Sequence, residues 1–543
     1  MIRAIPEPRG WASRIEHLAT ADAVRRAWSG DYTLWGPHPD EIANRLGWLR
    51  LPQTMSEHVG PLRQFVESVR SEGCDAVALL GMGGSSLAPE TLARTLCSPA
   101  GAPRLIVLDT THPDALRRLA EPLDVRHTLF VVSTKSGTTT ETLSLFRHFY
   151  RLTRDAVGDA AAGGRFVAIT DPGSPLVELA HQHSFRHVFL NDPTIGGRYA
   201  ALSLVGLVPA ALLGLDLNEL LENARAMAAR CRPSIPLERN PAALLAALLA
   251  AHVDDGHDKA TFVIPEAIAS FGDWLEQLIA ESTGKGGVGL VPIVGEPLGT
   301  PDIYGTDRVF VRLGAGAETP HPTVDVEFLG PEDIGGQFFL WEFATALLGH
   351  LLEVNPFDQP DVESSKSVTR RMLSAYREQG ERPSAPCVSL TPDALRQFVS
   401  QAVPGDYIAI LAYLDPRPEI GESLAALRRA LRDATHCATT LGYGPRFLHS
   451  TGQLHKGDSG RGLFIELVDE PGHDLQIPDG TGRPVNFGLL LRAQAFGDAQ
   501  ALAARGRRVL VSDLGHNAPA LLREAAAAVR AAPGSTAPSR LGS

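Results

Sequence analysis

The order of apolar and polar residues predicts strands that alternate with helices along most of the chain. Short apolar runs begin near residues 76, 104, 128 and 165, and each leads through a turn into a stretch with apolar residues at helical spacing. Strands that alternate with helices of this length predict βαβ units, and therefore a parallel sheet covered by helices on both faces.

A second unit begins near Tyr199 with a long apolar stretch, which Gly206 and Pro209 interrupt, so that it predicts a buried helix rather than a membrane span. After Pro383 the composition is loop-like, and further strands and helices follow. The predicted fold class is α/β, with two nested, doubly wound parallel-sheet domains plus a C-terminal α/β region. The expected divisions are a helical N-terminal appendage at 1–55, sheet domains at 56–198 and 199–383, the C-terminal region at 384–532 and a disordered tail at 533–543.

Composition narrows the possible partners and compartment. The net charge of −12 argues against nucleic acid or an anionic membrane as a partner, because both favour basic surfaces. The five cysteines are scattered and form no C-x-x-C pair, which indicates neither a disulfide framework nor a thiolate zinc site. We therefore expect a cytoplasmic protein with no signal peptide, no membrane span and no metal site.

The segment from Thr128 to Thr142 has the composition of a phosphate-binding turn. A short apolar strand leads into seven hydroxyl side chains around Lys135. Thr138 and Glu141 have the spacing of a capping box, which predicts a helix start there, and the N-terminus of a helix favours an anion. The alternative is a turn whose hydroxyl groups only cap its own helix.

A glycine-rich turn at residues 81–86 also follows a strand and opens a helix. It lacks the third glycine of a dinucleotide fingerprint, because the sixth position is Ser86, and this argues against NAD. In a parallel sheet, Gly84 and Ser85 would emerge at the same edge as the hydroxyl-rich turn.

Three further motifs carry candidate chemistry. Gln277 and Glu281 are four residues apart on a predicted helix, so both side chains project from one face. Gln359 and Lys366 lie at a turn and on the helix that follows it, and Arg198 comes directly after a double glycine. Each motif also has an ordinary structural explanation. The first fits an exposed glutamate at a helix end, the second fits a capped helix start, and the third fits an arginine in a surface ion pair.

These motifs, in this order, resemble the phosphoglucose isomerase family over residues 75–366, and most closely the form joined to transaldolase in some bacteria. No transaldolase-like portion is present. The resemblance implies tandem sugar-isomerase domains and interconversion of glucose 6-phosphate and fructose 6-phosphate through a cis-enediol. It implies no metal and no redox cofactor.

The resemblance also implies a role for each matching residue. Glu281 would be the base that moves a proton between C1 and C2, and Arg198 would stabilise the charge on the enediolate. Gln277 and Gln359 would bind sugar hydroxyl groups, and Lys366 would assist opening of the pyranose ring. The residues that would hold the phosphate are Gly84, Ser85, Thr134, Lys135, Ser136 and Thr139.

One departure from the family concerns a histidine. The family places it soon after the glutamate motif, but residues 289–313 contain none. A matching motif occurs far downstream at residues 447–457, so we expect His449 to be the ring-opening histidine, with His455 as second choice. The alternative is that both are loop histidines of an accessory region.

Two other functions are also compatible with the sequence. One is a non-catalytic regulator that binds a sugar phosphate, against which Glu281, Gln359 and Lys366 argue, because a sensor needs no base. The other is an isomerase of another sugar phosphate, such as mannose 6-phosphate. The expected partner is a hexose 6-phosphate. The oligomeric state stays open, because the family resemblance implies a homodimer with shared active sites, whereas the extra C-terminal region could supply within one chain what a partner subunit otherwise supplies.

Overall fold

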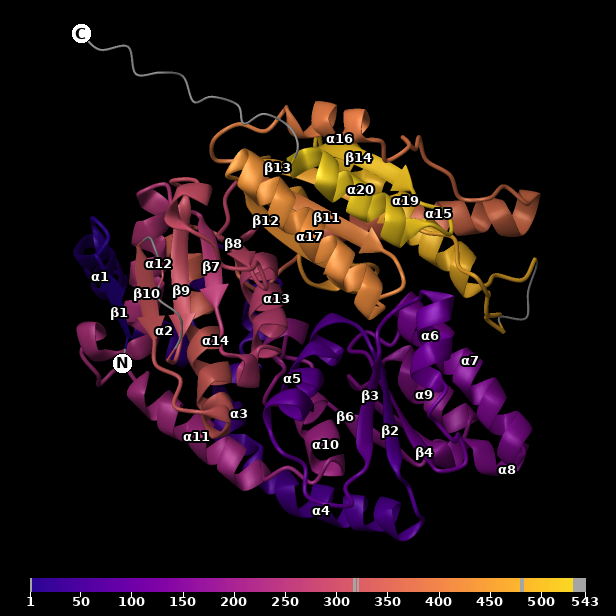
Figure 1. The fold of residues 1–543 in the computed structure, drawn as a ribbon. Coiled ribbons are helices and arrows are strands. Elements are labelled where there is room, and N and C mark those ends of the chain that lie inside the picture. Colours follow the sequence, from indigo (N-terminus) through magenta and orange to yellow (C-terminus); the bar gives the residue numbers. More distant parts are fainter. Residues whose placement is uncertain (1, 316–318, 320–321, 479–482, 531–543) are drawn as a thin grey trace.

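The computed structural model describes residues 2–315, 319, 322–478 and 483–530, and within them it contains three sheets (Figure 1). The α/β class with parallel sheets is therefore confirmed. The predicted disordered tail at 533–543 lies outside the described residues.

The first sheet is parallel and has the strand order β3-β2-β4-β5-β6. Every residue of its central strands β2 and β4 is buried, as is typical of strands with helices on both faces. The strands are β2 (Ala76–Gly81), β3 (Arg104–Leu108), β4 (Thr128–Ser133), β5 (Phe166–Thr170) and β6 (His187–Leu190). The helices of this part are α4 (Ser56–Ser71), α5 (Leu87–Thr95), α6 (Pro113–Ala120), α7 (Thr140–Val157), α8 (Asp159–Ala162) and α9 (Pro175–Gln182).

The second sheet has the order β1-β10-β9-β7-β8, and only β1 (Ile2–Ile5) runs antiparallel to its neighbour. The N-terminal segment was expected to be helical, and β1 differs from that expectation. Four residues carry too little periodicity to predict a strand, and its partner β10 is remote in sequence. The other strands are β7 (Lys259–Val263), β8 (Val291–Ile293), β9 (Arg308–Leu313) and β10 (Thr323–Val326).

The helices around the second sheet come from the N-terminal segment and from the second unit. The former are α1 (Trp11–Thr20), α2 (Ala23–Ser29) and α3 (Leu51–Thr54). The latter are α11 (Leu217–Arg230), α12 (Pro241–Asp254), α13 (Phe271–Thr283) and α14 (Ile334–Leu351). Helix α10 (Leu204–Leu212) also follows Tyr199 but packs against α4, α5 and β2 of the first part. In the described part of the chain, no helix is both long and apolar enough to cross a membrane.

The third sheet is parallel and has the order β12-β11-β13-β14. In Figure 1 this region lies across the other two sheets. Its strands are β11 (Tyr407–Tyr413), β12 (Ala438–Tyr443), β13 (Gly462–Val468) and β14 (Arg508–Asp513). The helices are α15 (Val362–Gln379), which leads into it, and α16 (Pro392–Val399), α17 (Pro418–Thr435), α18 (Gly452–Gly457), α19 (Phe487–Ala504) and α20 (Ala518–Arg530).

Helix α19 joins the third region to the first sheet. Its residues Phe487 and Leu490 belong to the core on one face of the first sheet, together with Phe130. On its other side Leu491 packs with Tyr413 of the third sheet. A helix that is apolar on all sides is buried between neighbours. The third region is therefore continuous with the rest of the molecule, which brings its loops to the first two sheets.

Candidate active site

Twelve of the thirteen predicted site residues line one cleft of about 370 Å³. They come from all three regions of the chain, and His455 is the exception. The twelve are Gly84, Ser85, Thr134, Lys135, Ser136, Thr139, Arg198, Gln277, Glu281, Gln359, Lys366 and His449.

One end of the cleft is formed by the two turns predicted to bind phosphate. The short helix Gly83–Ser85 follows β2, and residues 134–139 follow β4 and lead into α7. Because β2 and β4 are neighbouring parallel strands, both turns leave the sheet at one edge. Thr139 caps α7 without a side-chain hydrogen bond, so the cap side chain does not compete with an anion for the backbone N–H groups of the first turn.

Lys135 is already paired within the protein. Its Nζ donates to Asp171 Oδ2 at 2.5 Å and to the carbonyl of Pro193 at 2.7 Å. Burial raises the pKa of Asp171, although the lysine opposes that rise. Asp171 also lines the cleft, and nothing in the sequence pattern singled it out. A ligand phosphate at this end would therefore meet a lysine whose position is held by two protein oxygens.

The cleft also contains Glu281, which lies in the last turn of α13. The carboxylate is buried, and its Oε2 lies 3.4 Å from Arg198 Nη1 and 3.3 Å from Gln277 Nε2. Two further hydrogen bonds fix the position of the Arg198 guanidinium, which donates to Ser282 Oγ at 2.8 Å and to the carbonyl of Pro356 at 2.6 Å. A carboxylate in this position can accept a proton from a ligand. The fixed guanidinium beside it can then stabilise the negative charge that this leaves on the ligand.

Lys285 fixes the loop that carries Gln359. Its Nζ donates to the carbonyls of Asn355 and Asp358 at 2.8 and 2.6 Å and to Asp358 Oδ1 at 2.8 Å. Burial lowers the pKa of Lys285 to about 8. The sequence marked this lysine only as part of a glycine-rich break after α13, because its partners lie some 70 positions further on.

His449 reaches the cleft from the third region. It lies in the short helix Arg446–His449 after β12, and its Nε2 is 3.0 Å from Glu141 Oε1. Gln494 Nε2 donates to the same oxygen at 2.6 Å. Burial alone would raise the pKa of Glu141, but the imidazole of His449 holds that pKa below its ordinary value.

The capping box expected from Thr138 and Glu141 is wrong. Helix α7 begins at Thr140, its cap is Thr139, and the side chain of Glu141 points to the histidine. The spacing of a capping box also fits a glutamate in the first turn whose side chain leaves the helix for a tertiary partner.

The structure does not bring His455 to the cleft. It lies in α18 and is buried, with its ring 5.1 Å from that of Phe464 and 6.0 Å from that of Phe447. Burial lowers the pKa of His455 well below its ordinary value. These surroundings are those of a neutral core histidine.

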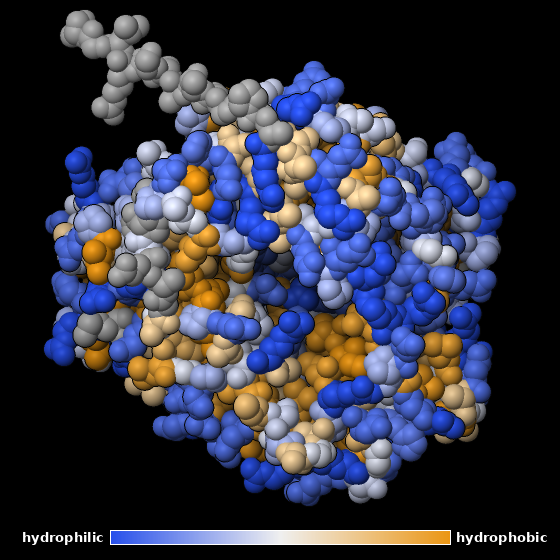
Figure 2. Space-filling model, in the orientation of Figure 1, coloured by the Kyte–Doolittle hydropathy of each residue, from blue (hydrophilic) through white to orange (hydrophobic). Residues whose placement is uncertain are grey.

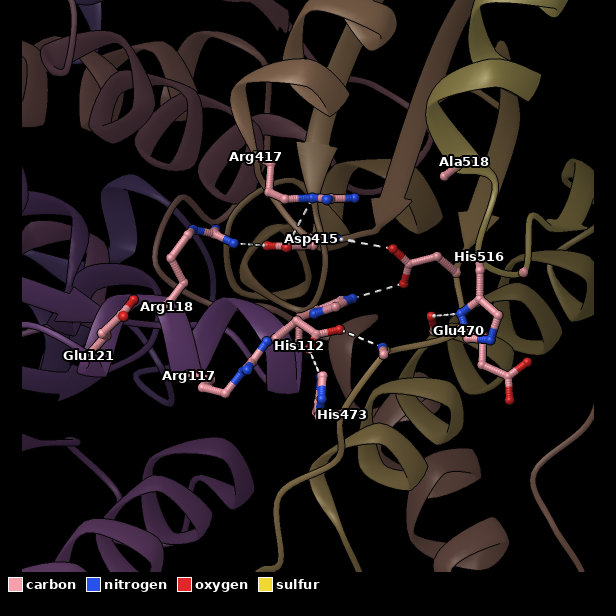
Figure 3. A pocket seen from close by; sticks show the side chains of 14 residues that line it. His112, Arg117, Arg118, Glu121, Asp415, Arg417, Glu470, His473, His516 and Ala518 are labelled. Carbon is pink, nitrogen blue, oxygen red and sulfur yellow. Dashed lines mark hydrogen bonds and ion pairs between the residues drawn. The ribbon is translucent and has the colours of Figure 1, made fainter.

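A larger cavity, of about 700 Å³, lies between α6 and the carboxyl ends of β11, β13 and β14, and none of the predicted residues lines it (Figure 3). Its charged side chains pair across the two regions. Arg118 Nη1 lies 2.5 Å from Asp415 Oδ1, and His112 Nε2 lies 2.8 Å from Asp469 Oδ1. This cavity is therefore part of the contact that holds the third region against the first.

The described residues contain no group of three or more His, Cys, Asp or Glu side chains placed to hold a metal ion. The polar groups of the cleft include hydroxyl groups, amides, two lysines, one histidine and the Glu281–Arg198 pair. Such groups can bind a phosphorylated polyol and transfer protons at it.

Comparison with known proteins gives consistent results. A family model described as phosphoglucose isomerase matches residues 54–291. The glucose-6-phosphate isomerase of Rubrobacter xylanophilus is 30% identical over 386 residues, which cover 60% of this chain and 88% of that protein. The glucose-6-phosphate isomerase of Carboxydothermus hydrogenoformans is 27% identical over 398 residues, which cover 60% of this chain and 85% of that protein.

Solved structures show the same likeness. A hypothetical protein from Thermus thermophilus has a TM-score of 0.59 and 26% identity, with 69% of this chain and 100% of that chain covered. A glucose-6-phosphate isomerase from Chlamydia trachomatis has a TM-score of 0.50 and 21% identity, with 60% of this chain and 74% of that chain covered. At that identity the second likeness concerns the fold alone.

Proposed function

Because this chain belongs to the phosphoglucose isomerase family and interconverts glucose 6-phosphate and fructose 6-phosphate, we propose that the reaction takes place in the cleft that contains Glu281, Arg198 and His449. The observation that carries the proposal is the convergence of twelve expected residues, from three regions of the chain, on one cleft. The arrangement also disfavours a pure sensor, since a base and an arginine line the same cleft as the phosphate-binding turns.

The sugar phosphate binds at the end formed by the two turns. The N–H groups at the start of α7, the hydroxyl groups of Thr134 and Thr139, and the remaining donor of Lys135 face the phosphate there. These two turns anchor the substrate through its phosphate. The binding energy of the phosphate then places C1 and C2 of the sugar beside Glu281.

Ring opening requires a proton donor at the ring oxygen and an acceptor at the anomeric hydroxyl. We assign this exchange to His449 and Lys366, which both line the cleft. The carboxylate of Glu141 orients the imidazole through the 3.0 Å contact. His455 is assigned no catalytic role, because it does not line the cleft.

Isomerisation then follows at Glu281. Its carboxylate removes the proton from C2 of the open aldose, the C–H electrons form the C1–C2 double bond of the cis-enediol, and the π electrons of the C1 carbonyl move to O1. The hydroxyl proton then passes from the oxygen on C2 to O1, the carbonyl forms at C2, and the electrons of the C1–C2 double bond take back the proton from the carboxyl at C1. Arg198, 3.4 Å from the carboxylate, stabilises the negative charge on the enediolate oxygens. Gln277 and Gln359 bind the sugar hydroxyl groups. One chain supplies all these groups, so the proposed site does not require the homodimer that the resemblance implies.

The substitution Glu281→Gln tests this assignment. It keeps the shape of the side chain and removes the base, so we expect turnover of fructose 6-phosphate to fall at least about 10²–10⁴-fold, the usual contribution of a general base. Binding of a sugar-acid phosphate inhibitor, measured by calorimetry, should be retained, because the phosphate end is unchanged.

His449→Ala and His455→Gln form the matched pair. We expect the first to lose turnover of the cyclic substrate and the second to keep it. Full turnover in Glu281→Gln would remove that residue from the role of base, and full turnover in His449→Ala would remove the histidine from ring opening.

A further inference from the structure

Arg446 lies three residues before His449, in the same short helix after β12, and it is surrounded by carboxylates from the other two regions. Its Nη2 lies 2.6 Å from Glu90 Oε2 and 3.4 Å from Asp273 Oδ2, and its Nη1 lies 3.1 Å from Asp109 Oδ2. We propose that Arg446 is a positioning residue, which holds the loop bearing His449 in the cleft. The proposal rests on the assignment of His449 to ring opening.

Each partner of Arg446 belongs to an element that carries another part of the site. Asp273 is in the first turn of α13, the helix that presents Glu281 to the cleft. Asp109 Oδ2 also accepts from Ser86 Oγ at 3.1 Å, and Ser86 is the last residue of the glycine-rich turn. Glu90 lies on α5, which that turn opens. One guanidinium thus links the histidine loop to the phosphate end and to the catalytic helix.

Arg446 itself does not line the cleft. It lies at a separate cavity of about 360 Å³, lined also by its three partners and by Glu276. Figure 2 shows the molecular surface hollowed where the third region meets the two sheets below it. Arg446 therefore cannot touch a substrate in the cleft, and any effect it has on the reaction passes through His449.

The charges around Arg446 explain why an arginine is needed. Four carboxylates, those of Glu90, Asp109, Asp273 and Glu276, line this cavity, and Arg94, which pairs with Glu90 at 2.8 Å, is largely exposed. Removal of Arg446 leaves Glu90, Asp109 and Asp273 without the guanidinium that all three contact. A lysine would restore one charge but not the planar fork that reaches carboxylates on three elements at once.

The loop has further contacts, among them the ring of Phe447 on that of Tyr413 and two polar contacts of His449. Gln277 Nε2 donates to the carbonyl of His449 at 2.7 Å, and the imidazole contacts Glu141. Gln277 lines the cleft and is expected to bind the substrate as well, whereas the contacts of Arg446 lie outside the cleft and are independent of the ligand. The guanidinium thus helps to hold the loop of His449 in place before substrate binds.

The test compares Arg446→Met, Arg446→Lys and the control Arg523→Met in a coupled assay on fructose 6-phosphate. Arg523 pairs with Glu419 on the exposed surface, 3.3 Å apart. We expect kcat of Arg446→Met to fall about 10²-fold, since misplacement of a catalytic group by about 1 Å has that effect, with little change in KM. Arg446→Lys should lie between Arg446→Met and the native protein, and Arg523→Met should match the native protein.

Two readouts separate positioning from a general loss of structure. In the double variant with His449→Ala, Arg446→Met should cause no further loss of kcat, because the residue acts only through the histidine. In Arg446→Ala, millimolar guanidinium should restore part of kcat by entering the vacated position, and urea of the same shape should not. If Arg446→Met fails to fold, Arg446→Lys carries the comparison with and without His449→Ala.

The outcomes distinguish this proposal from the assignment on which it rests. If His449→Ala keeps full turnover, the role of His449 fails. If His449→Ala loses turnover while Arg446→Met and Arg446→Lys keep it, only the role of Arg446 is overturned. An equal further loss of kcat from Arg446→Met in both backgrounds would also overturn it.

Discussion

At the scale of single residues, Glu276 shows how strongly the surroundings set the chemistry of a side chain. It precedes Gln277 on α13 but lines the cavity beside Arg446 rather than the cleft. Burial, together with the neighbouring charge of Asp273, raises the pKa of Glu276 to about 8. Arg446 is shared among the other carboxylates, so this group is neutral near pH 7.

The raised pKa has a consequence for stability. The folded protein retains a proton on Glu276 that the unfolded chain has lost above the ordinary value of 4.5. Stability should therefore fall as pH rises from about 4.5 to 8, by up to about 1.4 kcal/mol for each pH unit. In Glu276→Gln this contribution is absent, so we expect the variant to gain stability over the native protein as pH rises toward 8. Urea unfolding of both proteins at pH 6 and pH 8.5 measures the difference in unfolding free energy. An equal pH dependence of stability in the two proteins would contradict the prediction.

At the scale of elements, the cleft depends on the close approach of two turns. The short helix Gly83–Ser85 meets the short helix Gly197–Tyr199, which delivers Arg198. A Cβ atom on Gly84 would lie 2.1 Å from the carbonyl oxygen of Gly197. Only glycine allows this approach, which brings the phosphate end and Arg198 into one cleft.

Gly84→Ala should therefore separate the two turns. We expect a loss of about 1–3 kcal/mol of unfolding free energy, typical of overpacking, and a raised KM for fructose 6-phosphate. Denaturant unfolding and steady-state kinetics measure the two effects. Gly164→Ala is the control, because an added Cβ there meets nothing within 4 Å. Native kinetics in Gly84→Ala would show that the close approach is unnecessary.

At the scale of the whole molecule, a buried ion pair holds the second sheet against the third. Arg308 Nη1 lies 2.7 Å from Glu296 Oε2, and both side chains are almost completely buried. Glu296 Oε1 also accepts from Thr439 of β12, at 2.9 Å from its N–H and 2.6 Å from its hydroxyl group. This joint fixes the strand that leads to the His449 loop.

Glu296→Ala should leave the guanidinium of Arg308 buried without its partner. We expect a loss of about 3–5 kcal/mol of unfolding free energy, the usual effect of breaking a buried pair from one side. Chemical denaturation measures it. Glu238→Ala, at an exposed glutamate, should stay within about 0.5 kcal/mol of the native protein. Equal stability of the two variants would mean that the pair does not join the regions.

The sequence by itself determined the alternation of strands and helices, the parallel sheets and the identity of twelve cleft residues. These features depend on periodicity and on motifs a few residues long, which are local properties of the chain. The short strand β1 escaped that reasoning, because its partner is remote and it is too short to show a period.

Only the tertiary structure decided which partners the functional groups have. It turned Glu141 toward His449, paired Lys135 with Asp171, buried His455 and placed Arg446 among carboxylates of two other regions. Ion pairs and hydrogen bonds act over a few ångströms in space. The residues that form these pairs are tens to hundreds of positions apart, so no local pattern in the sequence specifies them.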